Sequence, residues 1–150
     1  MTNAIEAVVT TGERRFVTFY VDQLLIGLDI DQVQEINRQF DLTTVPRSPS
    51  FVRGVINLRG EVVTVIDLRR VLQMPEAELT KDSRNLIIQS DGEIIGLWVD
   101  QIADILNIPV EEVSPSPANV SGVDGRYFQG VHALENEIVV ILDIAETLAG

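Results

Sequence analysis

Residues 22–36 read DQLLIGLDIDQVQEI, and residues 91–105 read DGEIIGLWVDQIADI. Identical residues stand at many of the aligned positions, among them Asp22/Asp91, Gly27/Gly96, Leu28/Leu97, Asp31/Asp100, Gln32/Gln101 and Ile36/Ile105. A second match follows in the same order, between residues 51–72 (FVRGVINLRGEVVTVIDLRRVL) and residues 127–148 (YFQGVHALENEIVVILDIAETL). Two matches in one order indicate an internal duplication. We therefore interpret residues 1–150 as a single domain made of two copies of a small unit, at roughly 15–75 and 83–149.

Each copy is expected to begin with a β-hairpin. Residues 16–21 and 86–89 are rich in β-branched and aromatic side chains, which favour strands. Asp22-Gln23 and Asp91-Gly92 follow them, and Asp-Gly is a strong hairpin signal because both residues tolerate a positive φ. The residues after these turns are again apolar and form the second strand of each hairpin.

A short helix is predicted next, at residues 32–36 of the first copy and 101–105 of the second. Asp31 and Asp100 come directly before these segments, and Asp is a preferred residue at a helix N-cap. Apolar residues then recur three positions apart, as on one face of a helix. These pairs are Val33/Ile36 and Ile102/Ile105.

A second hairpin is predicted to close each copy. It joins residues 55–59 to 62–67 in the first copy and residues 131–135 to 138–143 in the second. Gly60 aligns with Asn136, and these are the residue types that enter the left-handed region most readily. The repeat therefore predicts a positive φ at both positions.

The fold class expected from this pattern is all-β. The runs 62–66 and 138–142 are apolar at nearly every position, so both faces of each strand should be covered. Short strands separated by turn residues are typical of small barrels or sandwiches. The two copies are expected to share an apolar interface.

Composition excludes several classes of function. Eleven Lys and Arg residues against 23 Asp and Glu residues give a net charge of −12. That charge argues against nucleic acid and against an anionic membrane surface, both of which attract cations. The charge falls mostly in the second half, since residues 1–75 carry a net −1 and residues 76–150 carry a net −11. With no Cys and a single His, neither a disulfide framework nor a Cys/His zinc site is expected.

A location in the cytoplasm is expected. Residues 1–15 lack the basic start and apolar stretch of a secretory signal. The longest apolar runs are far shorter than the ~18 residues that would suggest a membrane span.

No catalytic or metal-binding arrangement is apparent, and neither a cofactor nor an enzymatic activity is expected. His132 aligns with Ile56 inside an apolar strand, which favours a structural position. Asp29 and Asp31 could offer oxygens to a hard cation, but no calcium-loop pattern surrounds them. Asp67 recurs as Asp143, which favours a role in the fold. A hydrolase that uses the acidic face remains an alternative from a different class.

The repeat also supplies an internal control, because positions that differ sharply between the copies are freer to serve function. Four arginines of the first copy have no basic counterpart in the second: Arg53, Arg59, Arg69 and Arg70 align with Gln129, Glu135, Ala145 and Glu146. Arg59 flanks a hairpin turn, so it should be exposed, and its planar fork suits a carboxylate on a partner.

These strings resemble the CheW family of chemotaxis coupling proteins. The matching segments are DQVQEI at 31–36, FVRGVINLRG at 51–60, VIDLR at 65–69 and the closing segment 130–148. The resemblance implies two five-stranded β-barrels packed on a shared apolar interface, and we expect one barrel at roughly 15–75 and the other at roughly 83–149. It also implies a non-enzymatic adaptor that links the cytoplasmic tip of methyl-accepting chemoreceptors to the regulatory domain of a CheA-type histidine kinase. Such a protein would be recruited to membrane-associated receptor arrays.

The resemblance further assigns residues to two interactions. Val33, Glu35, Gly54 and Arg59 match family residues implicated in receptor coupling, with the receptor tip in the groove between the barrels. For the kinase, whose contact in the family lies largely on the second barrel, we expect Ile102, Asp104 and Ile105. A CheW-like adaptor of a pilus-motility or other chemosensory pathway is the alternative function.

Overall fold

The computed structural model describes residues 13–149 and contains two large β-sheets, a small two-stranded sheet, three 3-10 turns and two short helices. Residues 1–12, most of the segment read above as lacking a secretory signal, lie outside the described residues. The first half of the chain contains β1 (Glu13–Val21), β2 (Leu24–Asp29), η1 (Ile30–Gln32), β3 (Val33–Asn37), β4 (Val52–Leu58), β5 (Glu61–Asp67) and α2 (Leu68–Val71). The second half contains β6 (Arg84–Ser90), β7 (Glu93–Val99), β8 (Gln101–Pro109), η2 (Val110–Glu112), β9 (Ser114–Pro115), β10 (Asn119–Val120), β11 (Val123–Asp124), η3 (Gly125–Tyr127), β12 (Phe128–Ala133), β13 (Ile138–Leu142) and α3 (Ile144–Ala149).

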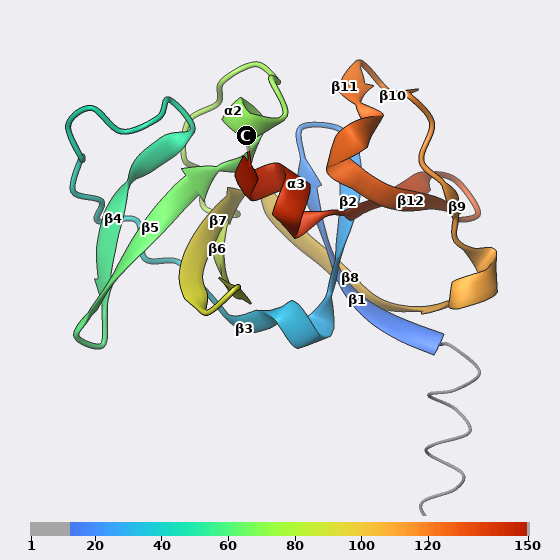
Figure 1. Ribbon diagram of the computed structural model, residues 1–150, viewed down its shortest axis with the longest axis horizontal. Helices are drawn as coiled ribbons and strands as arrows, with labels where there is room; N and C mark the ends of the chain where they lie inside the picture. Colours follow the sequence, from blue (N-terminus) through green and yellow to red (C-terminus); the bar gives the residue numbers. More distant parts are fainter. Residues whose placement is uncertain (1–12, 150) are drawn as a thin grey trace, which may run out of the picture.

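The two large sheets, here sheet A and sheet B, lie side by side (Figure 1). Sheet A has the strand order β8-β1-β2-β13-β12-β9, in which β9 has only two residues, and sheet B has the order β3-β6-β7-β5-β4. The all-β class is therefore confirmed. Strands β10 and β11 form a separate two-stranded hairpin.

The sheets do not follow the boundaries of the repeats, so the prediction of one barrel at 15–75 and the other at 83–149 is wrong. The hairpin β1–β2 of the first copy lies in sheet A with β12 and β13 of the second. The hairpin β6–β7 of the second copy lies in sheet B with β4 and β5 of the first. Two parallel pairs, β2 with β13 and β7 with β5, make this exchange. Hairpin turns fix only antiparallel neighbours, and two similar copies offer similar edges, so sequence could not decide which hairpins would join.

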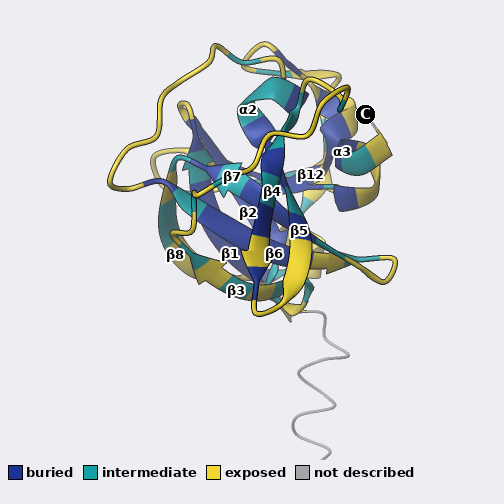
Figure 2. Ribbon diagram, turned by 90° about the vertical axis from the view of Figure 1, so that its left-hand side faces the viewer, coloured by how far each residue is buried: buried dark blue, intermediate teal, exposed yellow. Residues whose placement is uncertain are grey.

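The predicted apolar interface is confirmed, and the strands divide their side chains among three cores. Val140 and Leu142 of β13 face the largest cluster, which also contains Leu86 and Leu97 of sheet B. Val139 and Ile141 face a second cluster inside sheet A. A third cluster, which includes Val63, Val65 and Ile87, lies inside sheet B. Because successive strand side chains point to opposite faces, strands that are apolar throughout contribute to the shared core and to a core of their own. Figure 2 shows the strands of this interior in the buried colour.

The two predicted helices are wrong: residues 33–37 form β3, and residues 101–105 belong to β8. Both segments run along the edge of a sheet, β3 against β6 and β8 against β1. In β3 intermediate and exposed residues alternate, which is a strand pattern, and over five residues the i, i+3 spacing of Val33 and Ile36 fits it equally well. Neither aspartate caps a helix there. Asp29 instead accepts a hydrogen bond from the Asp31 amide in η1, and Asp100 accepts one from the Asp22 amide.

Most of the predicted turns are confirmed. Asp22, Asp91 and Gly92 have positive φ values, and so do Arg59 and Gly60 between β4 and β5. Asn136 does not, so that prediction is wrong. The connection from β12 to β13 has four residues, 134–137, against two from β4 to β5, and the Leu134 amide donates to the Glu137 carbonyl at 2.7 Å. A longer loop spreads the reversal and has no need of a left-handed residue at that point.

The recurring aspartates at the ends of β5 and β13 serve the fold, as predicted. An Asp67 side-chain oxygen accepts from the Arg69 amide at 3.0 Å, and Asp143 accepts from the Glu146 amide at 3.2 Å. Each caps the short helix that follows it. Within residues 13–149, no helix is long and apolar enough to cross a membrane.

Candidate interaction sites

The Glu35 and Arg59 side chains form an ion pair that joins opposite ends of sheet B. Glu35 lies on β3, at one edge of the sheet, and Arg59 lies in the turn that follows β4, at the other edge. Three strands separate β3 from β4 in the sheet order, so contact between these ends means that the sheet curls back on itself. The pair therefore marks the seam of a small barrel.

Neighbouring polar groups fix the geometry of this pair. The Asn37 amide group donates to the second Glu35 carboxylate oxygen at 3.0 Å. The Asn57 side chain accepts from the Gly60 amide at 2.9 Å and holds the turn that carries Arg59. The hydrogen bonds that Glu35 accepts from Arg59, the larger cause, and from Asn37 keep the pKa of Glu35 below its usual value. The Arg59 side chain is 70% exposed and that of Glu35 is 27% exposed, so an ordered guanidinium faces solvent.

Gly54 lies on β4 and acts through its backbone. Its φ is +150°, and a Cβ atom at this position would lie 2.5 Å from the Thr43 carbonyl oxygen. The close approach lets Thr43 and Val55 exchange two backbone hydrogen bonds of 2.9 Å. Gly54 therefore admits the segment that leads from β3 back to β4.

Val33 is half-buried on β3, opposite Ile88 of β6, and packs against the shared core. Of the four residues predicted for receptor coupling, Glu35 and Arg59 are thus in direct contact. Val33 precedes Glu35 on the same strand, and Gly54 precedes the turn of Arg59 on β4. All four lie on the two edge strands of sheet B or on the turn beside them, and their receptor role stays a prediction.

The residues predicted for the kinase lie on β8, the edge strand of sheet A. The Thr18 hydroxyl of β1 donates to the Asp104 carbonyl at 2.5 Å and accepts from its amide at 3.0 Å, which anchors the strand. Ile105 is 54% exposed, whereas Ile102 packs against the shared core. In the repeat β8 corresponds to β3, so both predicted interactions fall on equivalent edge strands. Nothing in the structure tests the kinase assignment.

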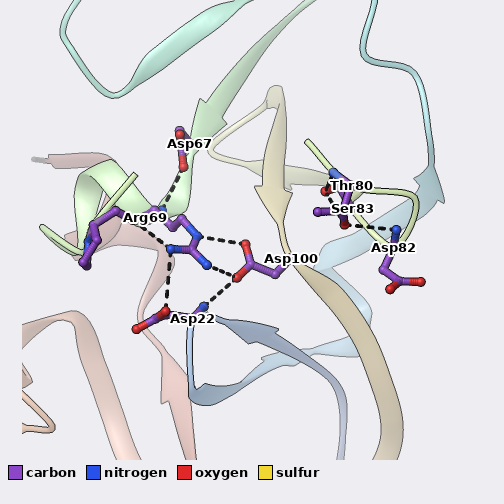
Figure 3. A network of polar contacts seen from close by, with 8 residues as sticks. Asp22, Asp67, Arg69, Thr80, Asp82, Ser83 and Asp100 are labelled. Carbon is purple, nitrogen blue, oxygen red and sulfur yellow. Dashed lines mark hydrogen bonds and ion pairs between the residues drawn. The ribbon is translucent and has the colours of Figure 1, made fainter. Parts of the chain in front are cut away.

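The four arginines that distinguish the first copy do not form one exposed cluster. Only Arg59 is largely exposed; the side chains of Arg53, Arg69 and Arg70 are 23%, 13% and 28% exposed. Each is paired within the chain: Arg53 with Asp67, Arg69 with Asp100 and Asp22 (Figure 3), and Arg70 with Asp67 and Glu76. Three of the four hold the two copies or the helix α2 in place, so the contrast between the repeats mainly reflects internal pairing.

Sequence reasoning missed a cation–π contact between Arg53 and Trp98. Its guanidinium carbon lies 3.9 Å from the centre of the Trp98 ring, which in turn packs against Phe40 at 5.3 Å. The Arg53 Nε atom lies 3.4 Å from an Asp67 carboxylate oxygen and is buried without a hydrogen-bond partner among residues 13–149. Burial raises the pKa of the Asp67 carboxyl, and Arg53 opposes that rise. A signal was present, because Trp98 stands where the first copy has Asp29.

Two of the groups considered for catalysis or metal binding, His132 and Asp29, have structural partners. His132 of β12 lies 3.0 Å from the Glu112 carbonyl oxygen, next to β8. Asp29 pairs with Arg14 at 2.6 Å and caps η1. Among residues 13–149, no group of three or more His, Asp or Glu side chains is placed to hold a metal ion.

Comparison with known proteins agrees with this description. The model of the CheW-like domain family matches residues 15–150. The chain is 32% identical to "Chemotaxis protein CheW" of Rhizobium meliloti, over 96% of this chain and 92% of that protein. It is 35% identical to "Protein FrzA" of Myxococcus xanthus, over 91% of this chain and 86% of that protein.

Among solved structures, the scaffolding protein TtCheW from Thermoanaerobacter tengcongensis superposes with a TM-score of 0.81 at 30% identity. It covers 87% of this chain, which itself covers 84% of that structure. A family model that spans nearly the whole chain, relatives of similar length and a shared fold together show the family of this protein. The chain belongs to the CheW family of chemotaxis adaptor and scaffold proteins.

Proposed function

We propose that this protein couples the cytoplasmic tip of chemoreceptors to the regulatory domain of a CheA-type histidine kinase. The observation that carries the proposal is the Glu35–Arg59 pair, which holds an exposed guanidinium at the seam of sheet B. An arginine already fixed by an intramolecular carboxylate loses little side-chain entropy when it meets a partner. Its free donors can then bind a carboxylate or carbonyl group of the receptor tip.

A second surface for the kinase is proposed on β8. Edge strands present unpaired backbone groups and are ready to meet another chain. Ile105 offers exposed apolar area beside them. Because β3 and β8 belong to different sheets, one molecule would hold both partners at once, as a coupling protein must.

The proposed role is that of a scaffold without catalysis, which acts in the cytoplasm and is recruited to receptor arrays. A second candidate is an adaptor in a pilus-motility or other chemosensory pathway. The similarity to Protein FrzA supports keeping it, since that relative, whose name does not mention chemotaxis, is 35% identical to this chain over 91% of its length. Both candidates use the same two surfaces and differ in the receptor that is bound.

The test is a pull-down from a lysate of the native cells, followed by co-sedimentation with receptor-containing membranes. The wild-type protein is expected to recover a chemoreceptor and a CheA-type kinase. Arg59→Glu should lose the receptor and keep the kinase, and Ile105→Asp should do the reverse. Lys81→Glu makes the same change of charge as Arg59→Glu in an exposed loop and serves as the control.

Exchange of the two charges gives a sharper test of the role of Arg59 in receptor binding. If the pair acts by orienting Arg59, the double variant Glu35→Arg/Arg59→Glu should restore folding stability but not receptor binding. Retention of the receptor by a folded Arg59→Glu variant would show that this site is wrongly assigned. Recovery of a receptor from a pathway other than chemotaxis would select the second candidate.

A further inference from the structure

A small apolar pocket lies beside the start of β1 in sheet A. Its volume is about 230 Å³. Three of the residues that line it, Phe16, Ile108 and Ile141, belong to the core inside sheet A and are at most 2% exposed. Val110 of η2 also lines the pocket and is 47% exposed. The pocket therefore connects the surface with the apolar interior of sheet A.

The first strand begins next to this pocket. Arg14, the second residue of β1, lines the pocket, and Ile108 of β8 lies opposite Arg14 in the strand pairing. Twelve residues precede Glu13, at which β1 begins. They read MTNAIEAVVTTG and include three branched aliphatic side chains, those of Ile5, Val8 and Val9. Aliphatic side chains thus stand in the sequence within a few residues of an apolar pocket.

The segment before the first strand of the second repeat has a different character. When the alignment of the first hairpins is extended toward the N-terminus, residues 76–81 (EAELTK) align with residues 7–12 (AVVTTG). The segment before β6 is held by an ion pair of 2.9 Å between Arg70 and Glu76. Glu76 aligns with Ala7, which cannot form such a pair. The segment before β1 therefore offers apolar side chains where the segment before β6 offers charged ones.

We propose that residues 1–12 fold back onto this pocket and place the side chains of Val8 and Val9 in it. The four residues between Val9 and Arg14 suffice for a reversal of the chain, since tight connections need about two to five residues. Gly12 suits such a turn, because glycine adopts positive and negative φ values equally readily. The valines would leave water and would also cover the pocket, and both changes are favourable.

Charge supports the same occupant. Glu6 is the only charged side chain among residues 1–12, and it is opposite in sign to Arg14 at the pocket, whose side chain is 43% exposed. Carboxylate and guanidinium groups attract one another, although an exposed pair adds little. No residue of the pocket belongs to the receptor or kinase sites proposed above, so this inference does not rest on the proposed function.

The test uses a spin label on the full chain of residues 1–150. The sequence contains no cysteine, so a nitroxide attached to an Ala4→Cys variant marks a single position. In the isotope-labelled protein it should broaden the amide signals of Ile108, Gln129 and Ile141, which line the pocket, in comparison with the reduced label. Val8→Asp/Val9→Asp in the same background should lower the docking equilibrium constant roughly tenfold or more, and these signals should return.

Matched variants localise the effect. Thr10→Asp/Thr11→Asp adds the same two charges to the same segment outside the proposed contact, and the broadening should persist. Val110→Asp places a charge at the exposed side of the pocket and should restore the signals. Val62→Asp makes that change at a valine of β5 in sheet B that is 72% exposed, and should leave the broadening unaltered.

Some results would overturn the proposal. One is the absence of broadening at Gln129 and Ile141, and another is broadening that survives in Val8→Asp/Val9→Asp or in a folded Val110→Asp variant. A mixture of isotope-labelled protein without nitroxide and unlabelled protein with nitroxide tests the source of the segment. Broadening in that mixture would show that a second copy fills the pocket, which would also refute docking within one chain.

Discussion

Replacement of Gly54 by alanine tests whether this family residue acts through the backbone. The structure places the Thr43 carbonyl oxygen 2.5 Å from the position that a Cβ atom would take, and the φ of +150° is one that residues with a side chain rarely adopt. Since the contact is with backbone and not with a flexible side chain, relief requires Thr43 to move away from β4. Both hydrogen bonds between Thr43 and Val55 would then be lost.

The expected loss of stability has two parts. A residue other than glycine in such a conformation costs about 1–3 kcal/mol. Each of the two hydrogen bonds contributes about 0.5–1.5 kcal/mol. The free energy of unfolding should therefore fall by about 2–6 kcal/mol. For a domain of this length that corresponds to a decrease in Tm on the order of 10 °C.

The assay is equilibrium unfolding in urea, followed by the fluorescence of Trp98, the only tryptophan of the chain. Gly60→Ala is the matched control, because Gly60 has a φ of +88° but no atom within 4 Å of its Cβ position. It should lose only the cost of the backbone conformation, about 1–2 kcal/mol. The reasoning fails if Gly54→Ala is no less stable than Gly60→Ala. In that case the presence of Gly54 in the family motif would have to be explained by a contact at the protein surface and not by backbone packing.

Two further predictions concern charged groups. The pKa of Glu35 is lowered in the folded protein, so its ionised form contributes stability that is fully present above its ordinary pKa of 4.5 and is lost as the pH falls through the lowered value. The Glu35→Gln variant should therefore lose less stability than the wild type on acidification from about pH 5 to pH 3. Tm values of both proteins across that pH range check this prediction. Arg69→Leu leaves Asp22 and Asp100 facing one another without their cation, and because Arg69 is largely buried the free energy of unfolding should fall by about 2–4 kcal/mol. Urea unfolding of Arg69→Leu beside Lys81→Leu checks the second prediction, and equal losses in the two variants would contradict it.

What the sequence could predict is what neighbouring residues decide. The Asp22 and Asp91 turns and the Gly60 turn follow from local backbone preferences, and the structure has all of them. The runs of β5 and β13, apolar at nearly every position, predicted strands covered on both faces. The three cores account for their buried residues, whereas Val62 and Ile138, which begin the runs, are exposed.

What the sequence could not predict depends on contacts between distant segments. Residues 33–37 have a pattern short enough to suit a helix or a strand, and only the edge of β6 decides between them. The close approach of Gly54 to the Thr43 backbone and the cation–π contact of Arg53 with Trp98 arise where segments far apart in sequence meet. The Glu35–Arg59 contact was likewise invisible, because the residues lie 24 positions apart and meet only when sheet B curls.

The exchange of hairpins between the sheets has a consequence for how such a molecule could arise. A single repeat supplies the first hairpin of one sheet and the remaining strands of the other. It cannot complete either sheet alone, since its apolar strand edges would remain open to water. Two identical copies of that half, however, would complete each other by the same parallel pairs and give a symmetric, interlocked dimer. Duplication followed by fusion through residues 73–83 would turn that dimer into one chain, free thereafter to make its two ends different: Arg69 stands at one end and Ala145 at the corresponding position of the other.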